Sequence, residues 1–167
     1  DITNELNISS YYKTDIHWKQ ENLEKVVRKI ENEMNLNKSA FPNIKKEYAP
    51  FYGALYSRTV SNIKNDKINY LTNDIINSAE VYNYEKKTYE KVYNENYLNN
   101  IDKYDIYLSG ASPLLIINNP NNQTKKELII FRDSFASSLA PLLIENYSKI
   151  TLIDLRYINS KLLKNIA

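Results

Sequence analysis

The last third of the chain contains the pattern that most constrains its fold, a buried strand followed by a helix and a second buried strand. Leu128–Phe131 is a short apolar run, and Ser134–Tyr147 carries leucines at helical spacing. Ile150–Ile153 is again rich in apolar and β-branched residues. A helix that connects two strands of one sheet makes those strands run in the same direction. The sequence therefore predicts an α/β fold with a central parallel sheet flanked by helices.

Three further elements can be predicted from the apolar pattern. Apolar residues in Asn22–Met34 recur at the i, i+3, i+4 spacing of a helix with one buried face. Asp105–Ser109 and Pro113–Ile117 are typical of strands. The turn-rich Asn118–Asn122 separates Pro113–Ile117 from the strand at Leu128–Phe131. We expect these two strands to pair or to lie beside each other.

A length of 167 residues fits one domain with a single core, so we treat 1–167 as one domain. The segment Asp66–Leu98 is rich in tyrosine and valine around the charged Glu85–Lys87. This pattern is typical of a polar hairpin, and we expect the segment to be an insertion or lid outside the main sheet.

Composition excludes several classes of function. Lys and Arg number 22 against 20 Asp and Glu, so the chain lacks the positive charge that nucleic-acid binding requires. It has no cysteine, one histidine and two glycines, so we expect no metal site, no phosphate-binding glycine loop and no cofactor. The apolar runs fall short of the roughly 20 residues that span a bilayer. Asp1–Glu5 does not resemble a signal sequence, so we expect any signal or anchor to lie outside this sequence.

The Asp133–Ser134 pair lies where a buried strand turns into a helix. A serine there presents its hydroxyl at the carboxyl edge of the sheet, where open α/β folds bind ligands. Amides at the start of the helix, with that of Ser134 first, would be available to an oxyanion. The alternative is that Asp133 or Ser134 only caps the helix.

A serine nucleophile needs a base, and His17 is the only histidine. Asp15 lies two residues before it and could accept a hydrogen bond from the imidazole, which would fix its tautomer. The alternative is a histidine on the surface or in the core with no catalytic role. We expect the neighbouring Trp18 to pack into the core and anchor this loop, because its large apolar area favours burial.

Three segments together resemble motifs of the DHHW protein family: Thr14–Trp18, Ile130–Ala136 and Ile153–Tyr157. The chain is also similar to the alginate O-acetyltransferase family of SGNH-hydrolase-like proteins. The resemblance implies a three-layer, flavodoxin-like SGNH-hydrolase-type fold with Ser134 as nucleophile and Asp15 and His17 completing the triad. Ile16 replaces the first histidine of the family motif, and Arg132 stands where SGNH hydrolases usually have glycine.

Three other residues are candidates for the oxyanion or for substrate binding. Arg156 follows the strand Ile150–Ile153 and could bind a polar or anionic group, or else form an ion pair with Asp154 or Asp133. Arg132 adjoins the Asp-Ser turn. Gly53 could supply a second oxyanion amide, although a simple turn explains it equally well.

Two functions follow as hypotheses. The first is a serine esterase or O-acyltransferase, with acetyl as the expected group, acting on a carbohydrate or acylated small molecule of the cell envelope or outside the cell. The second is a non-catalytic module that binds a glycan or a partner at the bacterial cell surface and keeps a vestigial triad. Either would place the full-length protein outside the cell, secreted or anchored to the membrane.

Overall fold

In the computed structural model, residues 1–58 and 63–159 are described. The chain forms three α-helices and seven strands among these residues, joined by short 3-10 helices. Their bounds are β1 (Ile44–Phe51), β2 (Asp66–Thr72), β3 (Glu80–Asn83), β4 (Thr88–Lys91), β5 (Leu114–Asn118), β6 (Glu127–Phe131), β7 (Lys149–Ile153), α1 (Glu24–Glu33), α2 (Asp74–Ser78), α3 (Ala136–Leu139), and the 3-10 helices η1 (Thr3–Glu5), η2 (Ile8–Ser10), η3 (Gln20–Asn22), η4 (Tyr56–Arg58), η5 (Glu95–Asn99), η6 (Lys103–Ile106) and η7 (Ala140–Asn146).

The protein is a mixed α/β protein, but the prediction of a central parallel sheet is wrong. Five strands form one sheet in the order β4-β3-β5-β7-β6, and only the β6–β7 pair is parallel. The pairs β3–β4, β3–β5 and β5–β7 are antiparallel. The parallel pair is the strand-helix-strand unit found in the sequence. Where no helix crosses over, as between β5 and β6, the chain reverses direction.

The β5 and β6 strands do not lie beside each other as expected, because β7 lies between them. The helical connection after β6 brings the chain back between β6 and β5. There β7 pairs with β5 on one side and with β6 on the other. The strand expected at Asp105–Ser109 is also absent. Its first residues belong to η6, and Leu108 and Ser109 have φ near 56°, which a strand cannot contain.

The segment Asp66–Leu98 is not an insertion outside the sheet. Its first strand, β2, pairs with β1 in a separate two-stranded ribbon, and β3 lies inside the five-stranded sheet between β4 and β5. The predicted hairpin does exist, since β3 and β4 pair across a turn after Asn83. This hairpin extends the sheet because β3 also pairs with β5. Val81 on β3 is fully buried in the core.

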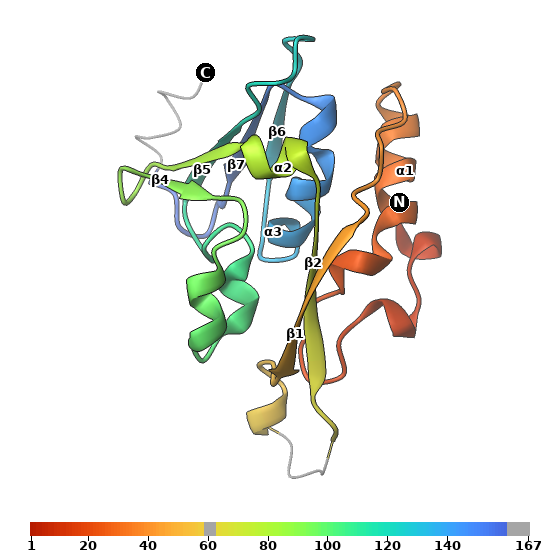
Figure 1. Cartoon of the computed structure of the whole chain (residues 1–167), viewed down its shortest axis with the longest axis vertical. Coiled ribbons are helices and arrows are strands. Elements are labelled where there is room, and N and C mark those ends of the chain that lie inside the picture. Colours follow the sequence, from red (N-terminus) through yellow and green to blue (C-terminus); the bar gives the residue numbers. More distant parts are fainter. Residues whose placement is uncertain (59–62, 160–167) are drawn as a thin grey trace.

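Helices cover one side of the sheet in two layers. The helix predicted at Asn22–Met34 is confirmed as α1, which buries Val26 and Val27. The helix expected at Ser134–Tyr147 is divided into α3 and η7, because Pro141 has no N–H to continue the α-helical bonding. Figure 1 shows α3 and the turns after it between the sheet strands β6 and β7 and the outer helix α1. This arrangement places the turn after β6 against the N-terminal loop.

Candidate active site

Ser134, His17 and Asp15 meet at the turn between β6 and α3. The Nε2 atom of His17 lies 2.8 Å from Ser134 Oγ, and Nδ1 lies 2.5 Å from Asp15 Oδ1. His17 and Asp15 are buried, whereas Ser134 is half-buried and faces a cavity. A serine hydroxyl bonded to one imidazole nitrogen, with a carboxylate on the other, is the arrangement that activates serine as a nucleophile.

The loop that carries His17 is folded back on itself and anchored by Trp18. Tyr11 and Trp18 form an isolated antiparallel bridge, and the Tyr12 amide donates to the His17 carbonyl. The prediction that Trp18 packs into the core is confirmed, because it is 7% exposed. Its indole N–H lies 3.1 Å from the Phe135 carbonyl and 2.9 Å from Ser138 Oγ. Trp18 therefore ties the histidine loop to the helix that follows the serine.

Asp66, at the start of β2, holds the other end of this loop. One oxygen of its buried carboxylate accepts hydrogen bonds from the Lys13 amide, the Thr14 amide and the Thr14 hydroxyl, at 2.8, 2.7 and 2.8 Å. Sequence reasoning missed Asp66, which is 52 residues from Thr14. The only signal was an acidic residue at the start of a strand.

Asp15 is held as an orienting carboxylate by three donors. Oδ1 accepts from the His17 amide as well as from the ring, and Oδ2 accepts from the Ala54 amide at 2.8 Å. Burial alone would raise the pKa of Asp15, but the hydrogen bonds from His17 and Ala54 outweigh it and lower the pKa below its usual value. Asp15 therefore stays ionised and can stabilise a positive charge on His17.

Gly53 has a different role from the expected oxyanion donor. Its amide donates to Thr14 Oγ1 at 3.2 Å, so it is already engaged. A Cβ atom at this position would overlap the side chain of Asp15. The absence of a side chain is what lets the loop after β1 approach Asp15 and present the amide of Ala54.

Neither Asp133 nor Ser134 caps α3, because the N-cap residue of this helix is Phe135 and no side chain caps it. Asp133 is exposed, and its Oδ1 accepts from the Phe135 amide at 3.0 Å across the turn. Ser134 Oγ instead contacts His17. The helix-cap alternative is therefore wrong for both residues, and Asp133 instead closes the turn that precedes α3.

Arg132 stabilises the turn after β6 through hydrogen bonds made by its side chain. Its guanidinium is buried and donates to Ser137 Oγ at 2.6 Å and to the carbonyls of Gly110 and Ser112 at 3.2 Å each. Burial lowers the pKa of Arg132. Arg132 is among the residues lining the cavity beside Ser134. Its two terminal nitrogens are engaged by the protein, whereas its buried Nε has no hydrogen-bond partner among the described residues. Arg132 holds the loop before β5 against the turn after β6, a role that the glycine of SGNH hydrolases could not perform.

Arg156 forms the ion pair that was the alternative to substrate binding. Its Nε and one terminal nitrogen lie 2.9 and 2.7 Å from the two carboxylate oxygens of Asp154. This bidentate contact lowers the pKa of Asp154. The side chain of Arg156 is 52% exposed and still lines the cavity beside Ser134. Substrate contact therefore remains a prediction for Arg156.

The cavity beside His17 and Ser134 has a volume of about 260 Å³ and is lined by three carboxyl groups, those of Asp102, Asp105 and Asp154. Asp105, on η6, lines it together with His17 and Ser134. Burial, reinforced by the nearby Asp102, raises the pKa of Asp105 to about 6. This group carries a full negative charge only above that pH, so the charge of the cavity changes near neutrality.

We predict that Asp105→Asn makes the thermal stability of the protein less dependent on pH. A carboxyl whose pKa is raised by folding favours the folded state below its unfolded pKa, and that advantage is lost as the pH rises through about 6. Asn keeps the shape without the charge. The melting temperature of the variant should therefore exceed that of the parent at pH 7.5 but not at pH 4. Equal differences at both pH values would contradict this assignment.

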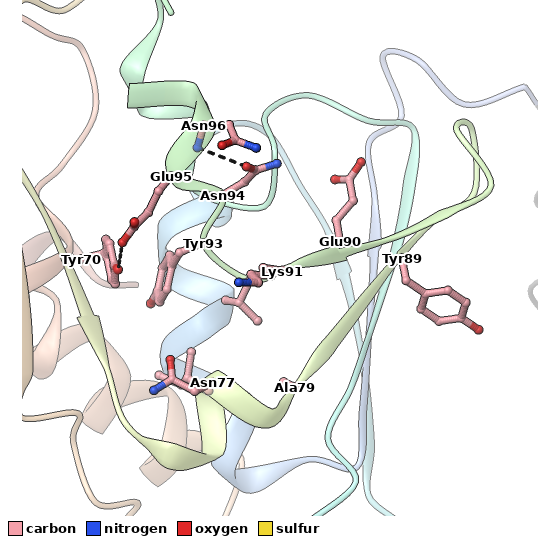
Figure 2. A pocket seen from close by; sticks show the side chains of 12 residues that line it. Tyr70, Asn77, Ala79, Tyr89, Glu90, Lys91, Tyr93, Asn94, Glu95 and Asn96 are labelled. Carbon is pink, nitrogen blue, oxygen red and sulfur yellow. Dashed lines mark hydrogen bonds between the residues drawn. The ribbon is translucent and has the colours of Figure 1, made fainter. Parts of the chain in front are cut away.

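A larger cavity of about 540 Å³ lies between β2, α2, β4 and η5, and no triad residue lines it. Figure 2 shows Tyr70 bonded to Glu95 on one side of this cavity, with Tyr93 beside them and Tyr89 directed away. Tyr70 and Tyr93 stack on each other with ring centroids 4.2 Å apart and are 7% and 8% exposed. The stacked faces of Tyr70 and Tyr93 are therefore used within the protein.

Nowhere in 1–58 and 63–159 do three or more His, Asp or Glu side chains gather so that they could hold a metal ion. None of the helices in these ranges is long and apolar enough to cross a bilayer.

No protein-family model and no curated protein matches this sequence. Solved structures do match. A DHHW family protein from Eubacterium siraeum DSM 15702 aligns with a TM-score of 0.71 and 18% identity over 95% of this chain and 56% of that chain. Bacillus cereus PatB1 aligns with a TM-score of 0.66 and 18% identity over 91% of this chain and 56% of that chain.

A second structure of PatB1, described as carrying a sulfonyl adduct, aligns with the same TM-score and identity over 89% of this chain and 53% of that chain. The chain thus spans little more than half the length of the structures it matches. At this identity the likeness concerns the fold alone: the chain shares the backbone arrangement of a DHHW family protein and of PatB1.

Proposed function

We propose that this protein is a serine esterase or O-acyltransferase of the DHHW and SGNH-hydrolase-like type. Its expected acyl group is acetyl, and its substrate is a carbohydrate of the cell envelope or the extracellular space. The observation that carries the proposal is the continuous hydrogen-bonded line from Asp15 through His17 to Ser134, at 2.5 and 2.8 Å. A vestigial triad in a binding module would not need to keep this geometry.

The reaction proceeds in two steps. His17 Nε2 takes the proton of Ser134 as Oγ forms a bond to the acyl carbonyl carbon, and the carbonyl oxygen becomes an oxyanion. When the carbonyl re-forms, the bond to the leaving alcohol breaks and His17 returns the proton to that alcohol. In the second step His17 takes a proton from water or from a sugar hydroxyl as that oxygen attacks the acyl-serine. The bond between the acyl carbon and Ser134 Oγ then breaks, and His17 returns the proton to Ser134 Oγ.

Asp15 and the turn after β6 assist both steps. Each transfer passes through a protonated His17, which the ionised Asp15 stabilises through Nδ1. The Ser134 amide at the turn is the proposed first donor to the oxyanion. With Gly53 engaged by Thr14, a second donor must come from another group that lines the cavity.

Two findings support the proposal without testing it. The fold matches that of a DHHW family protein, in agreement with the motifs in the sequence. PatB1, which shares the fold, has been captured with a sulfonyl adduct. Sulfonyl groups react with activated nucleophiles, so the same chemistry provides a direct probe of this chain.

The test is covalent labelling with a sulfonyl fluoride, followed by peptide mass spectrometry. We expect one adduct on Ser134 in the parent and none in His17→Ala, because the hydroxyl then lacks its base. Ser148→Ala is the matched control, since Ser148 lies beside the first residue of β7, at the opposite end of that strand from the site. It should label like the parent. Equal labelling of the parent and His17→Ala would refute an activated serine and favour the binding-module function.

A further inference from the structure

The imidazole of His17 lies flat against the ring of Tyr104, on η6. The two ring centroids are 3.8 Å apart and the planes are inclined by 7°. Phe135 contacts the same imidazole with centroids 5.0 Å apart, at an angle of 57°. His17 is therefore fixed at both ring nitrogens by Asp15 and Ser134 and on one face by a parallel aromatic ring.

Tyr104 is itself held in a single position. The side chain is 3% exposed, and its hydroxyl lies 2.8 Å from Ser138 Oγ. Ser138 Oγ accepts from the Trp18 indole and points its own hydrogen at the Phe135 carbonyl, which leaves Tyr104 as a donor. Burial strongly raises the pKa of Tyr104, so the ring remains a neutral phenol.

We propose that Tyr104 is a positioning residue that orients His17 and favours its protonated form. The inference rests on the proposed function, because its purpose is the proton transfer between Ser134 and substrate. The face of an aromatic ring carries partial negative charge and attracts a cation placed over it. The Tyr104 ring stacked on the imidazole therefore stabilises the imidazolium that forms in each step. It also prevents the imidazole of His17 from rotating away from Ser134.

The test uses the fact that His17 is the only histidine in the chain. Its ring protons can be followed by NMR through a pH titration without assignment of other histidines. We expect Tyr104→Leu to move the titration midpoint down by roughly 0.4–1.5 pH units, the range of a cation–π contact. Leucine keeps the surroundings apolar. Asp105, which lines the same cavity and has a pKa of about 6, is present in the parent and in every variant, so the difference between their midpoints reports the lost ring face. Tyr104→Phe keeps that face and should titrate within about 0.3 units of the parent.

Tyr93→Leu is the matched control, because Tyr93 is a buried tyrosine of the same aromatic cluster that stacks on Tyr70 and not on His17. It should lower the melting temperature and leave the titration unchanged. The kcat/KM profile gives a second reading: its acidic limb should move with the titration in Tyr104→Leu, with kcat reduced roughly tenfold and KM little changed. The NMR measurement does not require activity, so failure of the proposed function would not hide the result.

If Tyr104→Leu fails to fold, NMR spectra of the parent protein can still test the proposal. A ring stacked at 3.8 Å must shift the His17 ring protons upfield and give nuclear Overhauser contacts to Tyr104. Absence of both in the folded parent would overturn the proposal. So would a folded Tyr104→Leu with an unchanged midpoint, or a Tyr104→Phe variant that titrates like Tyr104→Leu.

Discussion

Replacing Ser134 or His17 by alanine should lower kcat for hydrolysis of an acetyl ester by roughly 10⁵–10⁶-fold, and the double variant should lose no more than either single one. The two residues act as one unit, because the hydroxyl is a poor nucleophile without its base and the base has no function without the hydroxyl. The measurement is steady-state and single-turnover hydrolysis of a generic acetyl ester by purified variants.

Asp15→Asn is the graded member of this series, with an expected loss of about 10⁴-fold. Both oxygens of Asp15 accept hydrogen bonds, so an amide nitrogen must face either the Ala54 amide or His17. The reacting groups remain, but the ring loses its correct partner. Full activity in Ser134→Ala would defeat the proposed mechanism, and inactivity of the parent on every acyl ester would favour the binding module.

Gly53→Ala should reduce activity by on the order of 100-fold, although Gly53 touches no reacting atom. The added methyl group would occupy the space of the Asp15 side chain. Asp15 would have to move away from His17, or the loop after β1 would have to withdraw its Ala54 amide. Overpacking of this kind also costs about 1–3 kcal/mol of folding free energy.

Denaturant unfolding and ester hydrolysis measured together test this prediction. Tyr52→Ala is a matched control, since it introduces alanine at the neighbouring position of the same loop, where the side chain is 43% exposed. It should keep activity within a few fold of the parent. Normal activity in Gly53→Ala would mean that the close approach to Asp15 is not needed for the site.

The residues of the candidate site could be found from the sequence because few alternatives existed. A chain with one histidine has one imidazole base, and the turn after the strand at Leu128–Phe131 is a local pattern. The β6–β7 pair follows from the same local pattern. The remaining sheet could not be predicted, because the direction of β3 and β5 is set by pairings between residues distant in the chain.

The supports of the site were missed for a related reason. Ala54 contributes only its backbone amide, which any residue would supply, so its identity carries no signal. Asp66 and Tyr104 reach the His17 loop from other parts of the chain. Arg132 and Arg156 were recognised as placed near the site, but the sequence could not tell a substrate contact from the internal bonds that both make.

The hydrogen bond between His17 and Ser134 joins residues 117 positions apart, and Asp66 and Ala54 lie between them in the chain. During synthesis the histidine loop emerges long before its serine, and no chain that ends before Ser134 contains the complete site. Under the proposed function, we expect Ser134 to become reactive only once both ends of this stretch have been made and have folded together. Sulfonyl fluoride labelling, applied during refolding, would count the molecules that have completed that assembly and ignore every earlier intermediate.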